Sequence, residues 1–391
     1  MTGAVGRSGS EALRNWLLNA ALPLWATRGV DVQRGGFFER LQRDLSPIEE
    51  MRRSRLVARQ IYCFATGHQL GWDGPSPKLV AHGLDFLLSR LVRPDGTVLM
   101  AVSADGGTVN ASYDAYDNAF VMFALAAATK AYANGSDLEG VACNVRDRLL
   151  QDWSHPVIGF QETSPPSKPL KANPHMHLFE ACLAWEELVG ARDPQWAALA
   201  DNMAQLALDH LISKQSGALS EYFDLDWRPC PQLRDTVVEP GHQFEWSWLL
   251  GRWAALRGSS TAFAAALRLA EIGERHGVDK VRGVAINALD GELSPRDCKA
   301  KPWPQTERIK AWHSLAHHPM NSAAGRAQAA AHVPAAIVGL ELFLNSAAPG
   351  LWHEQMLEDA SFDLQAVRAS TLYHVTCAVH TLSQPVAIQP S

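Results

Sequence analysis

The chain has little charge, no long apolar run and no excess of basic residues. Charged residues make up 19 % of its 391 residues, against about 25 % in an average soluble protein. The 35 Lys and Arg nearly balance the 41 Asp and Glu, so a net charge of −6 indicates no basic surface for nucleic acid. No apolar run reaches the roughly 20 residues that cross a bilayer. These absences argue against a nucleic-acid-binding or integral membrane protein, and the 47 % of apolar residues can fill a large core.

Several functional motifs are also missing. The six cysteines form no CxxC pair, and most stand among Ala, Leu, Val and Phe, where a reduced, buried thiol fits. We therefore expect a cytoplasmic protein. The sequence has no GxxxxGK[ST], no GxGxxG between a strand and a helix, and no GxSxG. A nucleotide cofactor and a serine hydrolase are thus not indicated.

Helical periodicity dominates the chain and predicts twelve helices in six consecutive pairs. The expected helices span residues 10–27, 50–71, 76–92, 113–132, 137–150, 175–190, 194–212, 241–257, 260–277, 304–317, 323–346 and 370–383. Two short β-hairpins are expected, with turns at 105–107 and 290–291. Because no long linker interrupts this pattern, we predict one domain over residues 1–391.

Six helix pairs that cannot each bury an apolar face alone can stack and close on themselves. An (α/α)6 barrel is one closed solution, in which alternate helices form an inner and an outer ring. An open helical superhelix is the alternative, but the sequence shows no repeat of roughly 34 or 40 residues. We therefore predict an all-α (α/α)6 barrel of twelve helices with short β-hairpins in the connecting loops.

The unusual polar residues lie mainly in the even-numbered expected helices, most of them in first turns. Examples are Arg59, His177, His242 and His374. If the even-numbered helices form the inner ring, these groups converge at one end of the barrel. His242 and Glu245 are three residues apart and share a helical face, so Glu245 can orient the imidazole. A pocket that contains an arginine, several histidines and carboxylates is suited to proton transfer.

Each residue also has a purely structural interpretation. His374 could be a core histidine, Arg59 half of a buried ion pair, and Glu180 and Glu307 ordinary acids of a first helical turn. Convergence of the whole set favours a functional site.

Metal ligation is less well supported. His313 and His317 are four apart and could face one ion, and His353 begins an HExxH pattern in which Leu357 replaces the second histidine. We predict no metal site.

Eight segments carry a resemblance to a known family. They are Gly35-Gly-Phe-Phe-Glu39, Ala58-Arg-Gln60, Tyr116-Asp-Asn-Ala-Phe120, Asn173-Pro-His-Met-His177-Leu-Phe-Glu180, Glu221-Tyr-Phe-Asp-Leu-Asp-Trp227, Glu239-Pro-Gly-His-Gln-Phe-Glu-Trp246, Pro304-Gln-Thr-Glu307 and Tyr373-His374. Their order and spacing, from about residue 33 to 380, resemble the N-acylglucosamine 2-epimerase superfamily. Its members include mannose isomerases, sulfoquinovose isomerases and cellobiose 2-epimerases.

The resemblance implies an (α/α)6 barrel and a 1,2-proton shift on a free sugar without metal or other cofactor. It implies that His242 and His374 are the acid/base pair, that Arg59 binds the oxygens of the enediolate, and that His177 supports the catalytic site. In the same scheme Glu245 tunes His242, and Glu307 and Trp246 hold the sugar. The expected substrate-contacting residues are Glu245, Trp246, Glu307, Asp117, Asn118, Tyr113 and Glu180.

The residue types fit this chemistry. A proton alpha to an aldehyde needs a base with a pKa near the working pH, which histidine supplies, and a fixed guanidinium stabilises the developing oxyanion. Moving the proton from C2 to C1 isomerises an aldose to a ketose, whereas returning it to the opposite face of C2 epimerises the sugar. The stretch Tyr116–Phe120 resembles that of mannose and sulfoquinovose isomerases, which favours the interconversion of D-mannose and D-fructose.

Other functions remain open. The main alternative is a 2-epimerase of N-acylglucosamine, of mannose and glucose, or of a disaccharide such as cellobiose. Arg52, Arg53 and Arg55 could reach an anionic tail on a phosphorylated or sulfonated hexose. A glycoside hydrolase with two carboxyl groups and a non-catalytic binding protein are further classes. We expect a small monosaccharide as the partner, with no nucleic acid and no membrane, and a monomer or homodimer.

Overall fold

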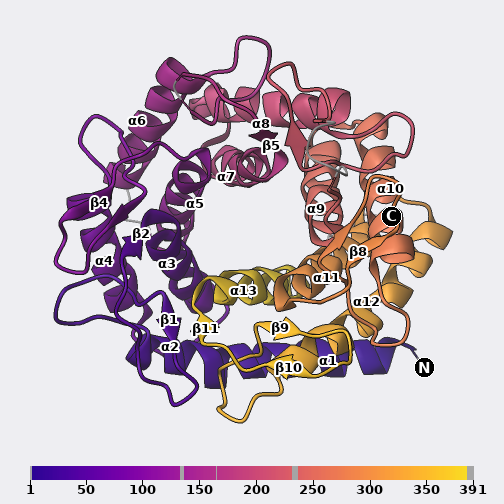
Figure 1. Ribbon diagram of the computed structural model, residues 1–391, viewed down its shortest axis with the longest axis horizontal. Coiled ribbons are helices and arrows are strands. Elements are labelled where there is room, and N and C mark those ends of the chain that lie inside the picture. Colours follow the sequence, from indigo (N-terminus) through magenta and orange to yellow (C-terminus); the bar gives the residue numbers. More distant parts are fainter. Residues whose placement is uncertain (1, 133–135, 164, 231–236, 385–391) are drawn as a thin grey trace.

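The computed structural model describes residues 2–132, 136–163, 165–230 and 237–384. Its helices form two concentric rings around one axis (Figure 1). The inner ring consists of α3 (Ser54–Gln69), α5 (Ala115–Ala131), α7 (Ala172–Val189), α9 (Pro240–Arg257), α11 (Pro302–His317) and α13 (Ser370–Ser383). The outer ring consists of α1 (Thr2–Trp16) with α2 (Leu22–Arg28), α4 (Ser76–Phe86), α6 (Ser136–Trp153), α8 (Pro194–Leu206), α10 (Ser260–Gly277) and α12 (Ala323–Leu344).

Several outer helices are continued or preceded by a turn that is wider (π) or tighter (3₁₀) than an α-helical turn. A π-helical turn at Leu17–Ala21 joins α1 to α2, so that the two run as one long helix. Similar turns extend α4 at Leu87–Leu91 and α8 at Ala207–Leu211, and a 3₁₀ turn at Gly190–Arg192 precedes α8. The described helices therefore match the twelve that periodicity predicts.

The inner ring closes on itself. Each inner helix packs against the next one, and α13 packs against both α11 and α3, which joins the end of the chain to its beginning. Figure 1 shows the C-terminal α13 lying beside the early helix α3. The (α/α)6 barrel is confirmed, with the even-numbered expected helices inside.

Apolar composition assigns helices to the inner ring. In α5, the run from Ala119 to Ala126 is buried on every side of the helix, as expected of a helix with neighbours all round. The outer α10 instead buries one stripe and exposes Glu271 and Arg275. Inner helices consequently have no solvent-facing side except at their ends.

Short antiparallel strands occupy the connections that lead into the inner helices. The two expected hairpins are confirmed as β3 (Ala101–Val102) with β4 (Thr108–Asn110), and β7 (Ala288–Leu289) with β8 (Pro295–Asp297). The remaining strands are β1 (Arg40–Leu41) with β11 (Val367–Arg368), β2 (Arg52–Arg53) with β3, β5 (Leu170–Lys171) with β6 (Tyr222–Phe223), and β9 (Gln355–Met356) with β10 (Phe362–Asp363). These two-residue strands are too short for a detectable alternation of apolar residues, and β2 explains why the helix expected from residue 50 begins at Ser54.

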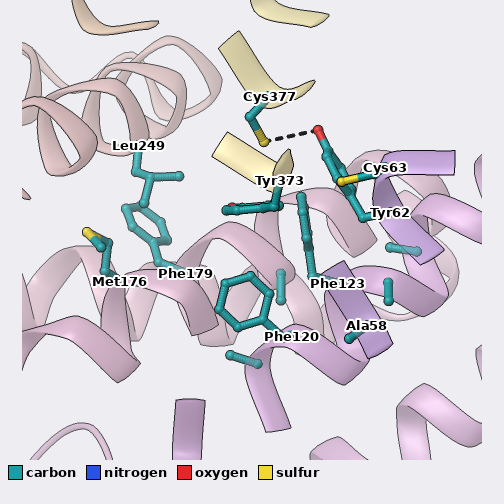
Figure 2. Packing of buried hydrophobic residues seen from close by; sticks show 14 of the residues in the cluster. Ala58, Tyr62, Cys63, Phe120, Phe123, Met176, Phe179, Leu249, Tyr373 and Cys377 are labelled. Atoms are coloured by element: carbon teal, nitrogen blue, oxygen red, sulfur yellow. Dashed lines mark hydrogen bonds between the residues drawn. The ribbon is translucent and has the colours of Figure 1, made fainter. Parts of the chain in front are cut away.

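An aromatic core fills the barrel axis beneath the ends of the inner helices. Figure 2 shows Tyr62, Phe120, Phe123 and Tyr373 packed together from α3, α5 and α13. The Tyr62 and Phe123 rings stack with centroids 4.7 Å apart, and Tyr62 accepts a hydrogen bond from Cys377 Sγ at 3.1 Å. This packing gives the polar residues above it a rigid floor.

One helix of the described chain, α12, is long and apolar enough by composition to span a membrane. It packs against α11 and α1 in the outer ring, and length and composition alone do not make it a membrane span.

Candidate active site

A cavity of about 520 Å³ opens at the barrel end where the inner helices begin. It brings together five residues that sequence analysis predicted to converge in one pocket: Arg59, His177, His242, His374 and Glu245. The other lining residues are Tyr116, Asn173, Glu239, Lys301, Pro302, Trp303, Glu354, Gln355, Gln365, Arg368, Ser370 and Thr371. The convergence follows from the fold, because most of these residues occupy first turns of inner helices or the strands that precede them.

His242 is held by a carboxylate from a different segment. Its Nδ1 donates a hydrogen bond to Glu221 Oε2 at 2.9 Å, and Glu239 Oε2 lies 3.7 Å away. Glu221 comes from the connection just before β6, which ends 17 residues before α9 begins. The expected partner Glu245 makes no hydrogen bond with His242; Glu221 orients the ring instead.

His374 has a matching arrangement. Its Nδ1 donates a hydrogen bond to Glu307 Oε1 at 2.9 Å, and Glu307 Oε2 lies 2.6 Å from Lys310 Nζ. Because Nδ1 carries the shared proton in both histidines, Nε2 is the atom left for substrate.

His177 lies deeper. Its Nδ1 donates to Glu180 Oε2 at 3.4 Å, and Tyr373 Oη donates to the same oxygen. Glu180 itself is buried behind His177 and does not line the cavity. We infer that Glu180 positions His177.

The surroundings push His242 and His374 toward opposite protonation states. Burial alone would lower the pKa of His242, but the negative charges of Glu221 and Glu239 outweigh it and raise that pKa to about 10. Burial, together with the positive charges of Arg59 and Lys310, lowers the pKa of His374 well below its usual value. Burial also lowers the pKa of His177 to about 4. At neutral pH, His242 is therefore protonated and His374 neutral, a division typical of proton-transfer sites.

Arg59 projects from α3 against aromatic rings. Its guanidinium lies 4.1 Å from the Phe120 ring centroid and donates to Tyr116 Oη at 2.5 Å. Arg59 Nε is buried and has no hydrogen-bond partner among the described residues. A buried donor without a partner is costly, so a substrate oxygen would satisfy it.

The aromatic residue beside the histidines is Trp303, not Trp246. The Trp303 ring centroid lies 5.0 Å from that of His242 and 5.7 Å from that of His374. Trp246 is fully buried one turn further along α9, where it packs against Phe179. Trp303 therefore offers the apolar face that a sugar ring needs.

Glu245 reaches the cavity with both carboxyl oxygens buried and without a hydrogen-bond partner in the described chain. Burial, reinforced by the nearby Glu307, raises the pKa of Glu245 well above its usual value. A protonated Glu245 can donate a hydrogen bond to a sugar oxygen. Glu307 is fully buried and acts through His374 and Lys310.

The residues expected from the start of α5 lie behind the cavity. Asp117 accepts a hydrogen bond from the Arg55 backbone at 2.9 Å, and burial raises its pKa to about 7. Asn118 donates to the Asp114 carbonyl, and Tyr113 stacks on Trp153 with centroids 3.5 Å apart. None of these three lines the cavity, whereas their neighbour Tyr116 does.

Part of the cavity wall comes from connections that periodicity cannot detect. Glu354, Gln355, Gln365 and Arg368 flank or belong to the strands β9–β11 before α13. No regular spacing marks them in the sequence. Trp303 was also not among the expected site residues, although it directly precedes the segment Pro304–Glu307 that carries the resemblance.

Three clusters of described residues have His and carboxylate atoms within 4.8 Å of one another. They are His177 with Glu180 and Glu245, His242 with Glu221 and Glu239, and His374 with Glu245 and Glu307. In each cluster a carboxylate oxygen lies within hydrogen-bond or ion-pair distance of the histidine.

Replacing Glu221 by glutamine should shift the pH dependence of the reaction. Removing this negative charge lowers the pKa of His242, so His242 loses its proton at a lower pH and the alkaline limb of kcat/KM moves toward neutrality. The measurement is a pH–rate profile of wild type and Glu221→Gln, with Glu239→Gln as the weaker counterpart at 3.7 Å. An unmoved alkaline limb in Glu221→Gln would show that His242 does not act as the acid.

Comparisons with known proteins agree with this geometry. The family model of N-acylglucosamine 2-epimerase (GlcNAc 2-epimerase) matches residues 36–378. A mannose-6-phosphate isomerase of Rhizobium meliloti (strain 1021) is 42 % identical over 371 residues, which is 95 % of each chain.

Solved structures share the fold at low identity. A cellobiose 2-epimerase from Bacillus thermoamylovorans B4167 superimposes with a TM-score of 0.84 at 17 % identity, over 96 % of this chain and 99 % of that one. A D-mannose isomerase superimposes with a TM-score of 0.81 at 19 % identity, over 95 % and 97 % of the two chains. From the family match and the relative at 42 % identity together, the chain belongs to the N-acylglucosamine 2-epimerase family and is an enzyme of the isomerase class.

Proposed function

We propose that the enzyme interconverts an aldose and a ketose of the mannose–fructose type by histidine acid/base catalysis. The observation that carries this proposal is the pair of cavity histidines, one protonated and one neutral at the same pH, next to an arginine with an unpartnered donor. A relative at 42 % identity is named a mannose-6-phosphate isomerase, and a protein with the same fold is named a D-mannose isomerase.

In the proposed reaction each group has a distinct role. Nε2 of the neutral His374 takes the proton from C2 of the open-chain aldose, and the electrons move into a C1–C2 double bond. The protonated His242 gives its proton to the C1 oxygen, while Arg59 stabilises the charge that develops on the C1 and C2 oxygens. His374 then returns its proton to C1, and the O2 proton goes back to His242, which completes the ketose.

Neighbouring residues hold this arrangement. Glu221 and Glu307 fix the two imidazoles through Nδ1, and Trp303 lies beside both rings. Glu245 donates to a sugar hydroxyl, and His177 with Glu180 supports the inner wall. We assign no role in substrate contact to Trp246, Asp117, Asn118 or Tyr113, which lie behind the cavity.

The same groups can support 2-epimerisation if His242, instead of protonating the C1 oxygen, gives its own proton to the opposite face of C2 while His374 keeps the proton it removed. Proton NMR of the reaction in D2O separates the two outcomes. With D-mannose or D-mannose 6-phosphate, we expect the fructose product with deuterium at C1. Conversion at C2 alone, giving a glucose product labelled at C2, would contradict the isomerase assignment.

The same assay tests whether the chemistry needs a metal ion. We expect full activity after exhaustive dialysis against EDTA, because His374 and His242 supply both proton transfers. Loss of activity that a divalent ion restores would contradict a metal-free mechanism.

We also place the enzyme in the cytoplasm. All six cysteines are free thiols in the structure, and four of them are buried, as is typical of proteins in reducing compartments. A free monosaccharide or its derivative is the partner that the cavity accommodates; a monomeric or homodimeric state stays a prediction.

A further inference from the structure

A second cavity, of about 490 Å³, adjoins the catalytic one. Arg59, Arg368 and Ser370 line both cavities, so the two lie side by side at these residues. We call the second cavity the arginine pocket. It is lined by Glu39, Arg40, Glu50, Arg53, Arg55, Leu56, Arg59, Arg368 and Ser370.

Positive charge is in excess in this pocket. Five arginines face it against two glutamates. Arg40 pairs with Glu50, and Arg53 Nη1 lies 2.9 Å from Glu39 Oε2. Within the pocket lining, two acids therefore offset two of the arginines.

Of the other three arginines, Arg55 has an acidic partner outside the pocket lining, whereas Arg59 and Arg368 form no ion pair with a described residue. Arg55 Nη1 lies 3.2 Å from Asp114 Oδ2 and its Nε 3.8 Å from Asp117 Oδ1. Burial raises the pKa of Asp117 to about 7, which weakens it as a counter-charge at neutral pH. The Arg368 side chain is exposed and has no hydrogen bond or ion pair with any other described residue. Arg59 has the buried, unpartnered Nε described above.

The fold gathers these arginines from three distant segments. Pairing of β1 with β11 places Arg40 opposite Arg368. Arg53 ends β2, and Arg55 and Arg59 follow on α3. Arg55 and Arg59 are four apart on one helical face, which sets them about 6 Å apart along the helix axis. A sugar whose reacting carbons lie at Arg59 therefore extends its other end toward Arg55.

Arg52, which sequence analysis grouped with Arg53 and Arg55, does not contribute. Its side chain is fully buried and bonds Asp31 Oδ2 at 2.9 Å and Glu49 Oε1 at 3.1 Å. Strand alternation in β2 turns it to the face opposite Arg53. The structure thus selects two of the three expected arginines and adds Arg368.

We propose that the substrate is a hexose phosphorylated at the end remote from C1, and that Arg53, Arg55 and Arg368 bind its phosphate in the arginine pocket. The planar guanidinium groups match the oxygens of a phosphate, and a phosphate ester carries about −1.5 to −2 charges at neutral pH, enough to balance the excess. This inference rests on the proposed isomerase function.

The test is a comparison of kcat/KM for D-mannose 6-phosphate, D-mannose 6-sulfate and D-mannose. We expect the wild type to favour the phosphate ester over mannose by at least about 100-fold. Arg368→Ala should lower kcat/KM for the phosphate ester about 10- to 100-fold more than for mannose, the effect of one hydrogen-bonded charge. The control is Arg252→Ala, near the opposite end of α9, which also removes one positive charge. It should leave the ratio of kcat/KM for the phosphate ester to kcat/KM for mannose as in the wild type.

Each other outcome is informative. Turnover of mannose but not of its 6-phosphate would overturn this inference and leave the isomerase function standing. Turnover of neither sugar would count against the isomerase function itself. Equal rates with the 6-sulfate and the 6-phosphate would overturn the assignment of a phosphate dianion.

Binding supplies a readout that does not depend on turnover. D-Mannitol 1-phosphate is an open-chain polyol phosphate that cannot isomerise. Calorimetry should show it binding the wild type, with affinity reduced at least 10-fold in Arg368→Ala and unchanged in Arg252→Ala. Equal affinity of the wild type for mannitol and mannitol 1-phosphate would overturn the phosphate site.

Discussion

Replacing His374 by alanine should lower kcat by about 10²- to 10⁴-fold, the usual contribution of a positioned general base. The substituted enzyme retains Arg59 and His242 but has no group to remove the C2 proton. His374→Asn is the sharper variant, because its amide can still donate to Glu307 in place of Nδ1 while lacking a base. Incorporation of solvent deuterium into the sugar, followed by NMR, should fall with kcat.

His242→Ala should cause a loss of the same order, since the C1 oxygen then receives no proton. The matched control is His317→Ala, which removes an exposed histidine near the other end of α11 and should leave kcat within about twofold. Circular dichroism and thermal unfolding establish whether each variant is folded. A folded His374→Asn enzyme with near-normal turnover would refute the assignment of the base.

Replacing Arg59 by alanine should lower kcat about 10²- to 10³-fold, comparable to the loss of one oxyanion-stabilising donor. The charge on the sugar oxygens develops only as the C2 proton leaves, so kcat should fall by a larger factor than KM rises. Steady-state kinetics of the variant in the isomerase assay measure both parameters.

Arg59→Lys separates charge from geometry. Lysine retains a cation but lacks the planar fork that lies against Phe120 and donates to Tyr116, so we expect it to remain at least about 10-fold below wild type. Full activity of Arg59→Lys would show that only the charge matters. Unchanged kcat in Arg59→Ala would remove Arg59 from the reaction altogether.

The helices were predictable because each carries its own periodic apolar pattern. The inner position of α3, α5, α7, α9, α11 and α13 followed from the polar residues in their first turns. Arg59, His177, His242 and His374 could be found in this way, since such residues stand out against the buried faces of apolar helices.

Residues outside regular helices were harder to place. Glu221 precedes a two-residue strand, and Arg368 ends another; neither position has a periodic environment. Glu245 was expected to orient His242 because it is three residues away, but the hydrogen bond comes from Glu221, 21 residues earlier. Trp246 was expected to contact the sugar. It is instead buried below the cavity, where its side chain packs against Phe179.

The sequence alone determined the twelve helices, favoured their closure into a barrel over an open superhelix, and indicated the kinds of side chain that gather at one end of it. Only the tertiary structure decided what those side chains do. His242 and His374 are the same residue type, yet Glu221 and Glu239 surround the first, while burial with Arg59 and Lys310 governs the second. Protonation depends on charges that folding brings within a few ångströms from distant segments, and no local pattern encodes that distance.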